Sequence, residues 1–127
     1  MAQPAEVVDT EIHLSHLGEM RAAGGKALTT GLSDAVIRQF LADDGALAAA
    51  IERAYVVYQD LKDAEPDLVA LDEAAQMKRV QDGIINFYAA DAVNPYVAAA
   101  AQGPWIVTLK GAVIYDCGGY GMLGLGH

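Results

Sequence analysis

Two histidines three residues apart, His13 and His16, are the first side chains whose types and spacing could do chemistry. On a helix this spacing allows both imidazoles to ligate one metal ion, and Glu11 and Glu19 lie nearby in the sequence. No pattern fixes a third ligand, however. A solvated helix end explains the same residues without a metal, and the sequence favours that simpler interpretation.

The single cysteine, Cys117, is the second candidate. A thiol becomes strongly nucleophilic where a cation or a helix terminus stabilises its thiolate, and neither neighbour, Asp116 or Gly118, provides this. A small buried residue is therefore the favoured interpretation of Cys117. No nucleophile elbow surrounds Ser15 or Ser33, so the sequence does not support a nucleophile with a histidine base.

Glycines fill the end of the chain, with five among the eleven residues 117–127. The order Gly118, Gly119, any residue, Gly121 suggests a phosphate-binding loop, but it lacks the following helix that the dinucleotide fingerprint requires. Glycines also permit a backbone to approach a ligand closely. The alternative is that they only make turns around a core residue, Tyr120.

The elements that must position these residues fall into two regimes. The first hundred residues are rich in Ala, Leu, Asp and Glu, and about the last twenty are rich in Gly, aromatic and β-branched residues. Apolar residues at helical spacing, with a cap at Ser33 and a break at Pro66, predict helices through the first regime. The expected helices are a short one from His13 that is broken by Gly24 and Gly25, one from Ser33 to between Asp43 and Gly45, one from about Ala46 to Lys62, one from Asp72 to about Ala89, and one from Pro95 to Ala101.

Two of these helices carry a clear apolar stripe, which predicts a face that packs on the protein core. The stripe of the third helix is Leu47, Ile51, Tyr55, Tyr58 and Leu61. That of the fourth is Met77, Val80, Ile84, Phe87 and Tyr88. The acidic segment between them, Asp60 to Asp72, is most simply a solvated face with a loop, and its alternative is a docking surface.

After Pro104 the pattern changes to two β-rich runs, Trp105 to Leu109 and Ala112 to Asp116. They flank Lys110 and Gly111, a pair that suits a tight hairpin turn because glycine accepts a positive φ. The sequence therefore predicts an α+β fold. A mainly helical amino-terminal region over residues 1–102 precedes a β-hairpin and Gly-rich segment over residues 103–127.

The overall composition excludes several classes of partner. The chain has 17 acidic and 8 basic residues, a formal net charge of -9, and no basic patch, so we expect no nucleic acid. One cysteine excludes an intrachain disulfide and fits a reducing, cytoplasmic location. The first ten residues, MAQPAEVVDT, lack the features of a secretory signal, and no long apolar run predicts a membrane span.

Residues 103–127, GPWIVTLKGAVIYDCGGYGMLGLGH, resemble the opening of class III pyridoxal-phosphate-dependent aminotransferases. In that family two strands joined by an Asp-Gly or Lys-Gly turn, the second ending in Asp, lead into a Gly-rich stretch that closes with Gly-His. The motif covers about a fifth of the chain. The helical region before it is similar to that of a subgroup with an extended amino-terminal helical part. The matching positions are Lys110 and Gly111, Tyr115 and Asp116, Gly118, Gly119, Gly121, Gly126 and His127.

The resemblance implies the start of a fold-type-I transferase. The complete enzyme would be a homodimer that uses pyridoxal 5'-phosphate to move an amino group from an amine or ω-amino acid to a 2-oxo acid. This segment would give dimer contacts and line the substrate pocket. The pocket-lining residues implied are Gly119, Tyr120, Gly121 and Met122, in which the glycines allow close approach and the ring and thioether form a mostly apolar wall.

No catalytic residue is expected within this chain. A transaminase needs a lysine that holds the cofactor covalently, an acidic partner for the pyridine nitrogen and a phosphate cradle, and in the family these come later. Lys110 lies at a turn, and Lys26, Lys62 and Lys78 lie on predicted loop or helix surfaces, so none is assigned that role. We expect this chain alone to be inactive and the enzyme to continue beyond His127.

The competing interpretation is a stand-alone acidic helical module that binds another protein without catalysis. It leaves unexplained why a tail containing Tyr120, Met122, Leu123 and Leu125 would be kept exposed. The length of the reading frame discriminates between the two interpretations.

Overall fold

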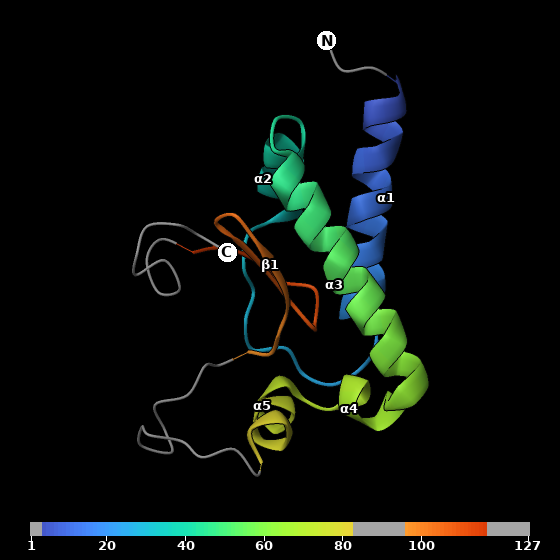
Figure 1. Ribbon diagram of the computed structural model, residues 1–127, viewed down its shortest axis with the longest axis vertical. Helices are drawn as coiled ribbons and strands as arrows, with labels where there is room; N and C mark the ends of the chain where they lie inside the picture. Colours follow the sequence, from blue (N-terminus) through green and yellow to red (C-terminus); the bar gives the residue numbers. More distant parts are fainter. Residues whose placement is uncertain (1–3, 83–95, 117–127) are drawn as a thin grey trace.

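Helices α1 to α5 precede a three-stranded antiparallel sheet in the computed structural model, which describes residues 4–82 and 96–116 (Figure 1). This order confirms the expected α+β fold. The helices are α1 (Pro4–Arg21), α2 (Asp34–Leu41), α3 (Gly45–Ala64), α4 (Pro66–Ala70) and α5 (Glu73–Gln81). The strands are β1 (Ala98–Gln102), β2 (Trp105–Thr108) and β3 (Val113–Tyr115).

Helix α1 is longer than the short helix expected from His13. It begins at Pro4, and proline at the start of a helix costs no hydrogen bond because the first N–H groups have no intrahelical partner. Leu14, Leu17 and Met20, which recur at helical spacing in the sequence, are buried. The helix ends before Gly24, whose φ of +101° is one that residues with a side chain rarely adopt.

Side-chain caps fix where the next two helices begin. Ser33 Oγ accepts a hydrogen bond from the Val36 N–H at 3.4 Å, which confirms the cap predicted for α2. Asp44 Oδ1 accepts from the Ala46 N–H at 2.9 Å and caps α3. The core residues of α3 are Leu47, Ala50, Ile51, Ala54 and Tyr58, which include three members of the predicted stripe.

The segment after α3 contains a helix that the sequence interpretation missed. Pro66 ends α3 and also begins α4, in which Leu68 and Val69 are buried, so the stretch up to Asp72 is not simply a solvated face with a loop. Helix α5 follows Asp72, as predicted. The Asp72 carboxylate does not cap α5, however, because Oδ1 accepts the Lys26 N–H at 2.7 Å.

Helix α5 ends at Gln81 among the described residues. Met77 of its predicted stripe is buried, whereas Val80 is exposed. The remaining stripe residues Ile84, Phe87 and Tyr88 lie outside the described part of the chain.

The β2–β3 hairpin confirms the strand prediction. Trp105 pairs with Tyr115, and Val107 pairs with Val113. The turn contains Gly111 with φ of +81°, the conformation for which a glycine was expected.

The helix predicted from Pro95 to Ala101 is wrong, because Ala98–Gln102 forms strand β1 and pairs antiparallel with β2. Alanine favours helix by local propensity, but here the backbone pairs with a strand whose four residues are all buried. A register shift between Ala98 and Ala100 marks a bulge in β1. Tertiary pairing therefore overrides local preference in this segment.

Helix α3 lies between α1 on one side and the sheet on the other (Figure 1). The core joins Leu17 of α1, Ile51 of α3, and Trp105 and Val107 of β2. At the surface, Arg21 pairs with Asp34 and Arg38 pairs with Glu11, so two ion pairs also join α1 to α2. Within the described residues, no helix is both long and apolar enough to cross a membrane.

Candidate functional site

The residues that the sequence assigned to a substrate pocket, Gly119, Tyr120, Gly121 and Met122, lie outside the described part of the chain, as does Cys117. What the structure describes is the hairpin that leads to them, up to Asp116.

The hairpin turn is docked on the last turns of α1. Arg21 Nε donates a hydrogen bond to the Gly111 carbonyl oxygen at 2.9 Å. A Cβ atom placed on Gly111 would lie 2.7 Å from the Leu17 carbonyl oxygen, so the turn and the helix approach too closely for any side chain there. On the other side of the hairpin, the Leu32 N–H donates to the Val113 carbonyl oxygen at 2.8 Å. Hydrogen bonds from α1 and from the loop between α1 and α2 therefore hold the hairpin in place.

Lys110 is buried, with 4% of its surface exposed, and its Nζ donates to the Gly24 carbonyl oxygen at 2.7 Å. Burial lowers the pKa of this amine, and the negative charges of Glu73 and Asp72 partly oppose that effect. The sequence placed Lys110 correctly at the turn but gave no sign of its burial. Lys26, Lys62 and Lys78 are exposed, as expected.

Buried polar groups on α5 lie in the same region. Glu73 is 1% exposed, and its Oε1 accepts the Thr29 N–H at 2.9 Å. The Gln76 amide donates to the Leu68 and Val69 carbonyl oxygens at 2.9 and 3.2 Å. Glu73 Oε2 and Gln76 Oε1 find no hydrogen-bond partner among the described residues. These groups fasten the loop and α4 to α5.

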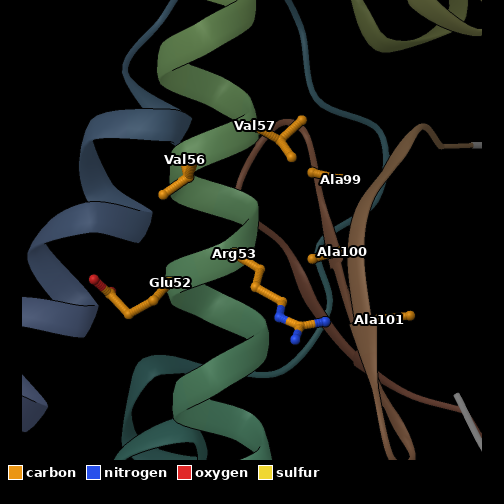
Figure 2. A pocket seen from close by; sticks show the side chains of 7 residues that line it. All are labelled: Glu52, Arg53, Val56, Val57, Ala99, Ala100 and Ala101. Atoms are coloured by element: carbon orange, nitrogen blue, oxygen red, sulfur yellow. The ribbon is translucent and has the colours of Figure 1, made fainter.

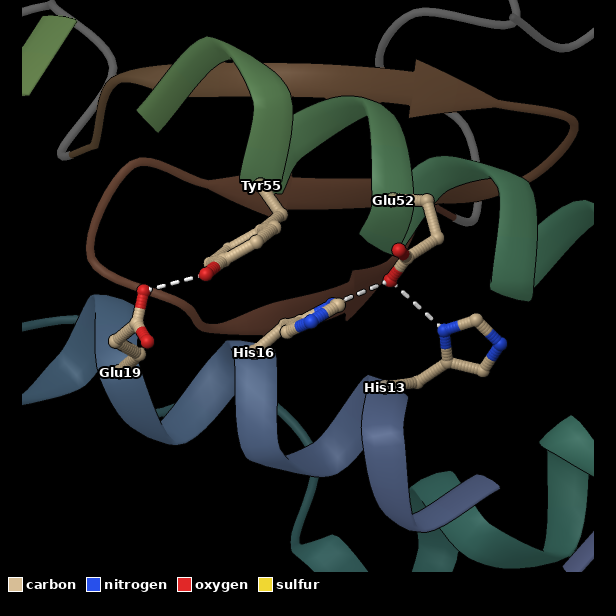
Figure 3. A network of polar contacts seen from close by, with 5 residues as sticks. All are labelled: His13, His16, Glu19, Glu52 and Tyr55. Atoms are coloured by element: carbon tan, nitrogen blue, oxygen red, sulfur yellow. Dashed lines mark hydrogen bonds and ion pairs between the residues drawn. The ribbon is translucent and has the colours of Figure 1, made fainter. Parts of the chain in front are cut away.

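A second polar cluster joins α1 to α3 (Figure 3). The Nδ1 atoms of His13 and His16 each lie 2.8 Å from Oε2 of Glu52. Partial burial acts to raise the pKa of the Glu52 carboxyl, but the hydrogen bonds from the two imidazoles outweigh it, and the pKa lies below its ordinary value. The interpretation of these histidines as a solvated helix end is therefore wrong, because both are partly buried and pair with Glu52 of α3. The sequence pattern gave no sign of this pairing, since Glu52 lies 39 residues from His13.

The same cluster continues along α1 to Glu19. The Tyr55 hydroxyl donates to Glu19 Oε2 at 2.6 Å, and this bond is the main cause that raises the pKa of Tyr55 to about 12. The Tyr55 ring also stacks on His16, with centroids 3.8 Å apart and planes 2° from parallel. Two side chains of α3 thus hold three of α1 (Figure 3).

The chemistry of this cluster is that of a carboxylate that orients two imidazoles through Nδ1. Such an arrangement fixes the ring positions and suits proton transfer at the opposite ring nitrogen. The hydroxyl of the cluster, that of Tyr55, donates to Glu19, and the raised pKa of Tyr55 does not favour its use as a nucleophile. Both Nδ1 atoms contact the same carboxylate oxygen. Within residues 4–82 and 96–116, no group of three or more His, Cys, Asp or Glu side chains is arranged to hold a metal ion.

A groove lies between α3 and β1 (Figure 2). It has a volume of about 530 Å³. Figure 2 shows Arg53 and Val57 directed toward β1, while Glu52 and Val56 are directed toward α1. The lining residues are Glu52, Arg53, Val56, Val57, Ala99, Ala100 and Ala101. The groove went unpredicted because its β1 wall was expected to be helical.

Comparison with protein-family models, with curated proteins and with solved structures finds no match for this chain.

Proposed function

We propose that this chain is the amino-terminal part of a class III aminotransferase, in which it contributes dimer contacts and part of the substrate pocket. The observation that carries the proposal is the β2–β3 hairpin. Its turn contains Lys110 and Gly111, and its second strand ends at Tyr115, directly before Asp116. The reaction of the complete enzyme would move an amino group from an amine or ω-amino acid to a 2-oxo acid.

The anchoring of the hairpin supports a positioning role. Contacts from Arg21, Gly24 and Leu32 hold its turn and its last strand. A segment that follows such a strand starts from a fixed point, which is what a pocket wall needs if it is to select a substrate. Residues 117–127 would thus reach the pocket from a rigid support.

Pyridoxal phosphate is implied by the resemblance alone, and the described residues do not fit it. The exposed lysines lie at three separate surface positions, and the ammonium group of the buried Lys110 donates a hydrogen bond to the Gly24 carbonyl oxygen. The cofactor supplies the electron sink of transamination wherever it binds. We therefore assign this part of the chain to the support of the pocket and assign no lysine in it to the cofactor.

The test is substrate selection by the protein expressed from the whole reading frame that contains this sequence. Tyr120→Ala should lower kcat/KM for the best amine donor by about tenfold, since one pocket contact of this size is worth one to a few kcal/mol. Leu28→Ala is the matched control, because Leu28 is 57% exposed in the loop after α1. Equal values for the two variants, or no amino transfer by the wild-type protein, would overturn the proposal.

A further inference from the structure

Two buried side-chain oxygens of α5 accept no hydrogen bond from the described residues. They are Oε2 of Glu73 and Oε1 of Gln76, and each of these residues is 1% exposed. Buried polar groups almost always have a partner, because an unpaired one loses its bonds to bulk water and gains none in return. Both oxygens therefore need a hydrogen-bond donor.

The other atoms of the two side chains fix which positions need that donor. Gln76 Nε2 donates to the carbonyl oxygens of Leu68 and Val69 at 2.9 and 3.2 Å. A flipped amide would place Oε1 against these two acceptors, so Oε1 is the acceptor that is left over. In Glu73, Oε1 already accepts the Thr29 N–H at 2.9 Å, which leaves Oε2.

The ammonium group of Lys110 belongs to the same buried cluster. Its Nζ lies 3.5 Å from the Val69 carbonyl oxygen, the same oxygen that the Gln76 amide contacts. The negative charge of Glu73 acts on Lys110, yet no ion pair joins the two in the described part of the chain. An ammonium has three N–H groups, and the carbonyl oxygens of Gly24 and Val69 take two of them. One N–H is therefore left for a further acceptor.

We propose that this cluster binds one internal water molecule. Water has two O–H groups and an oxygen that accepts, which matches two acceptors and one N–H. The water would donate to Glu73 Oε2 and to Gln76 Oε1, and it would accept from Lys110 Nζ. Lys110 would repel a metal cation at this place, and Glu73 would repel an anion, so a neutral molecule fits best.

The water would give the hairpin turn a connection to α5. The direct bonds of Lys110 reach Gly24, in the loop after α1, and Val69 of α4. A shared water adds Glu73 and Gln76 of α5, and it joins two opposite buried charges through hydrogen bonds. This proposal does not depend on the aminotransferase assignment.

A high-resolution crystal structure of the wild-type chain tests the site directly. We expect one water at a distance of about 2.7–3.2 Å from Lys110 Nζ, Glu73 Oε2 and Gln76 Oε1. Protein atoms bonded to the two oxygens in its place, or no water between the three groups, would overturn the proposal.

Magnetic relaxation dispersion of the water oxygen nucleus counts long-lived internal waters in solution. Glu73→Met should lose one such water relative to the wild type, because it removes an acceptor and the charge. Glu65→Met is the matched control, since Glu65 is exposed, and it should lose none. A wild type without any long-lived water, or equal counts in the wild type and Glu73→Met, would also overturn the proposal. Circular dichroism verifies the fold of both variants, and the two wild-type measurements decide if Glu73→Met does not fold.

Discussion

The indole Nε1 of Trp105 donates a hydrogen bond of 2.7 Å to Oδ2 of Asp44, while the other oxygen of the same carboxylate caps α3. One side chain therefore fixes both the start of α3 and the position of β2. Trp105 is completely buried, and the rings of Phe40 and Tyr115 each meet it edge-on, at centroid distances of 5.0 and 5.1 Å. The helices and the hairpin that leads to the proposed pocket are joined at this contact.

Asp44→Ala should lower the free energy of unfolding by roughly 2–4 kcal/mol. About 1 kcal/mol comes from the lost helix cap, and the rest comes from a buried indole N–H left without an acceptor. Urea unfolding followed by Trp105 fluorescence measures the change. The neighbouring Asp43→Ala is the control, because Asp43 is exposed and its side chain has no hydrogen bond or ion pair in the part of the chain that the structure describes. Equal stability of the two variants would contradict the role of Asp44.

Gly111→Ala should destabilise the hairpin, because the residue has φ of +81° and an added Cβ would collide with the Leu17 carbonyl oxygen. We expect the free energy of unfolding to fall by more than about 1 kcal/mol, because the backbone is strained and α1 must shift to make room. Gly18→Ala provides the opposite control. Gly18 lies inside α1, and a Cβ added there would meet no atom within 4 Å, so alanine should stabilise the protein by up to about 1 kcal/mol. Thermal unfolding of both variants tests the pair, and a shift of the same sign in both would be inconsistent with this structure.

Glu52→Gln should change how stability depends on pH. The folded-state pKa of Glu52 lies below its ordinary value, so the stability that its carboxylate contributes is present above the unfolded-state pKa of about 4.3 and is lost as pH falls through the lower folded-state pKa. The wild type should therefore be the more stable protein near neutral pH, and the difference should shrink in acid. Asp60→Asn, an exposed change on the same helix, controls for net charge. A difference that is constant over this pH range would refute the pairing.

Tyr55 should ionise at about pH 12, above the ordinary tyrosine pKa of about 10. Because its folded-state pKa is raised above the unfolded-state value of about 10, the stability from its bond to Glu19 is present below that pH and is lost as pH rises through about 12. Ultraviolet difference spectroscopy of the wild type and Tyr55→Phe identifies the transition. Glu19→Gln should move it to lower pH, and an unmoved transition would show that Glu19 is not the cause.

Local signals in the sequence predicted much of the fold. The Ser33 cap, the stripe of α3 and the glycine of the hairpin turn each act within a few residues, and the structure confirms all three. Strand β1 was predicted as helix because the preference of its alanines is local, whereas its pairing with β2 is set by the rest of the fold.

The candidate sites were harder to predict because their partners are distant in the sequence. Glu52 is 39 residues from His13, and Lys110 is 86 residues from the carbonyl oxygen of Gly24 that it contacts. The i, i+3 spacing of His13 and His16 puts both on one side of a helix, but the favoured interpretation was a solvated helix end. Their shared partner Glu52 depends on the packing of α1 on α3. The sequence did not predict that Arg53 lines a groove, because the groove exists only once β1 packs beside α3.

The aminotransferase proposal is tested most directly by intact-mass analysis of the protein from the whole reading frame, after incubation with pyridoxal phosphate and reduction with borohydride. We expect one reduced cofactor per chain, on a lysine other than Lys26, Lys62, Lys78 and Lys110, while the 127-residue chain gains none under the same conditions. A reading frame that ends at His127, or an extended protein that gains no cofactor, would contradict the proposal.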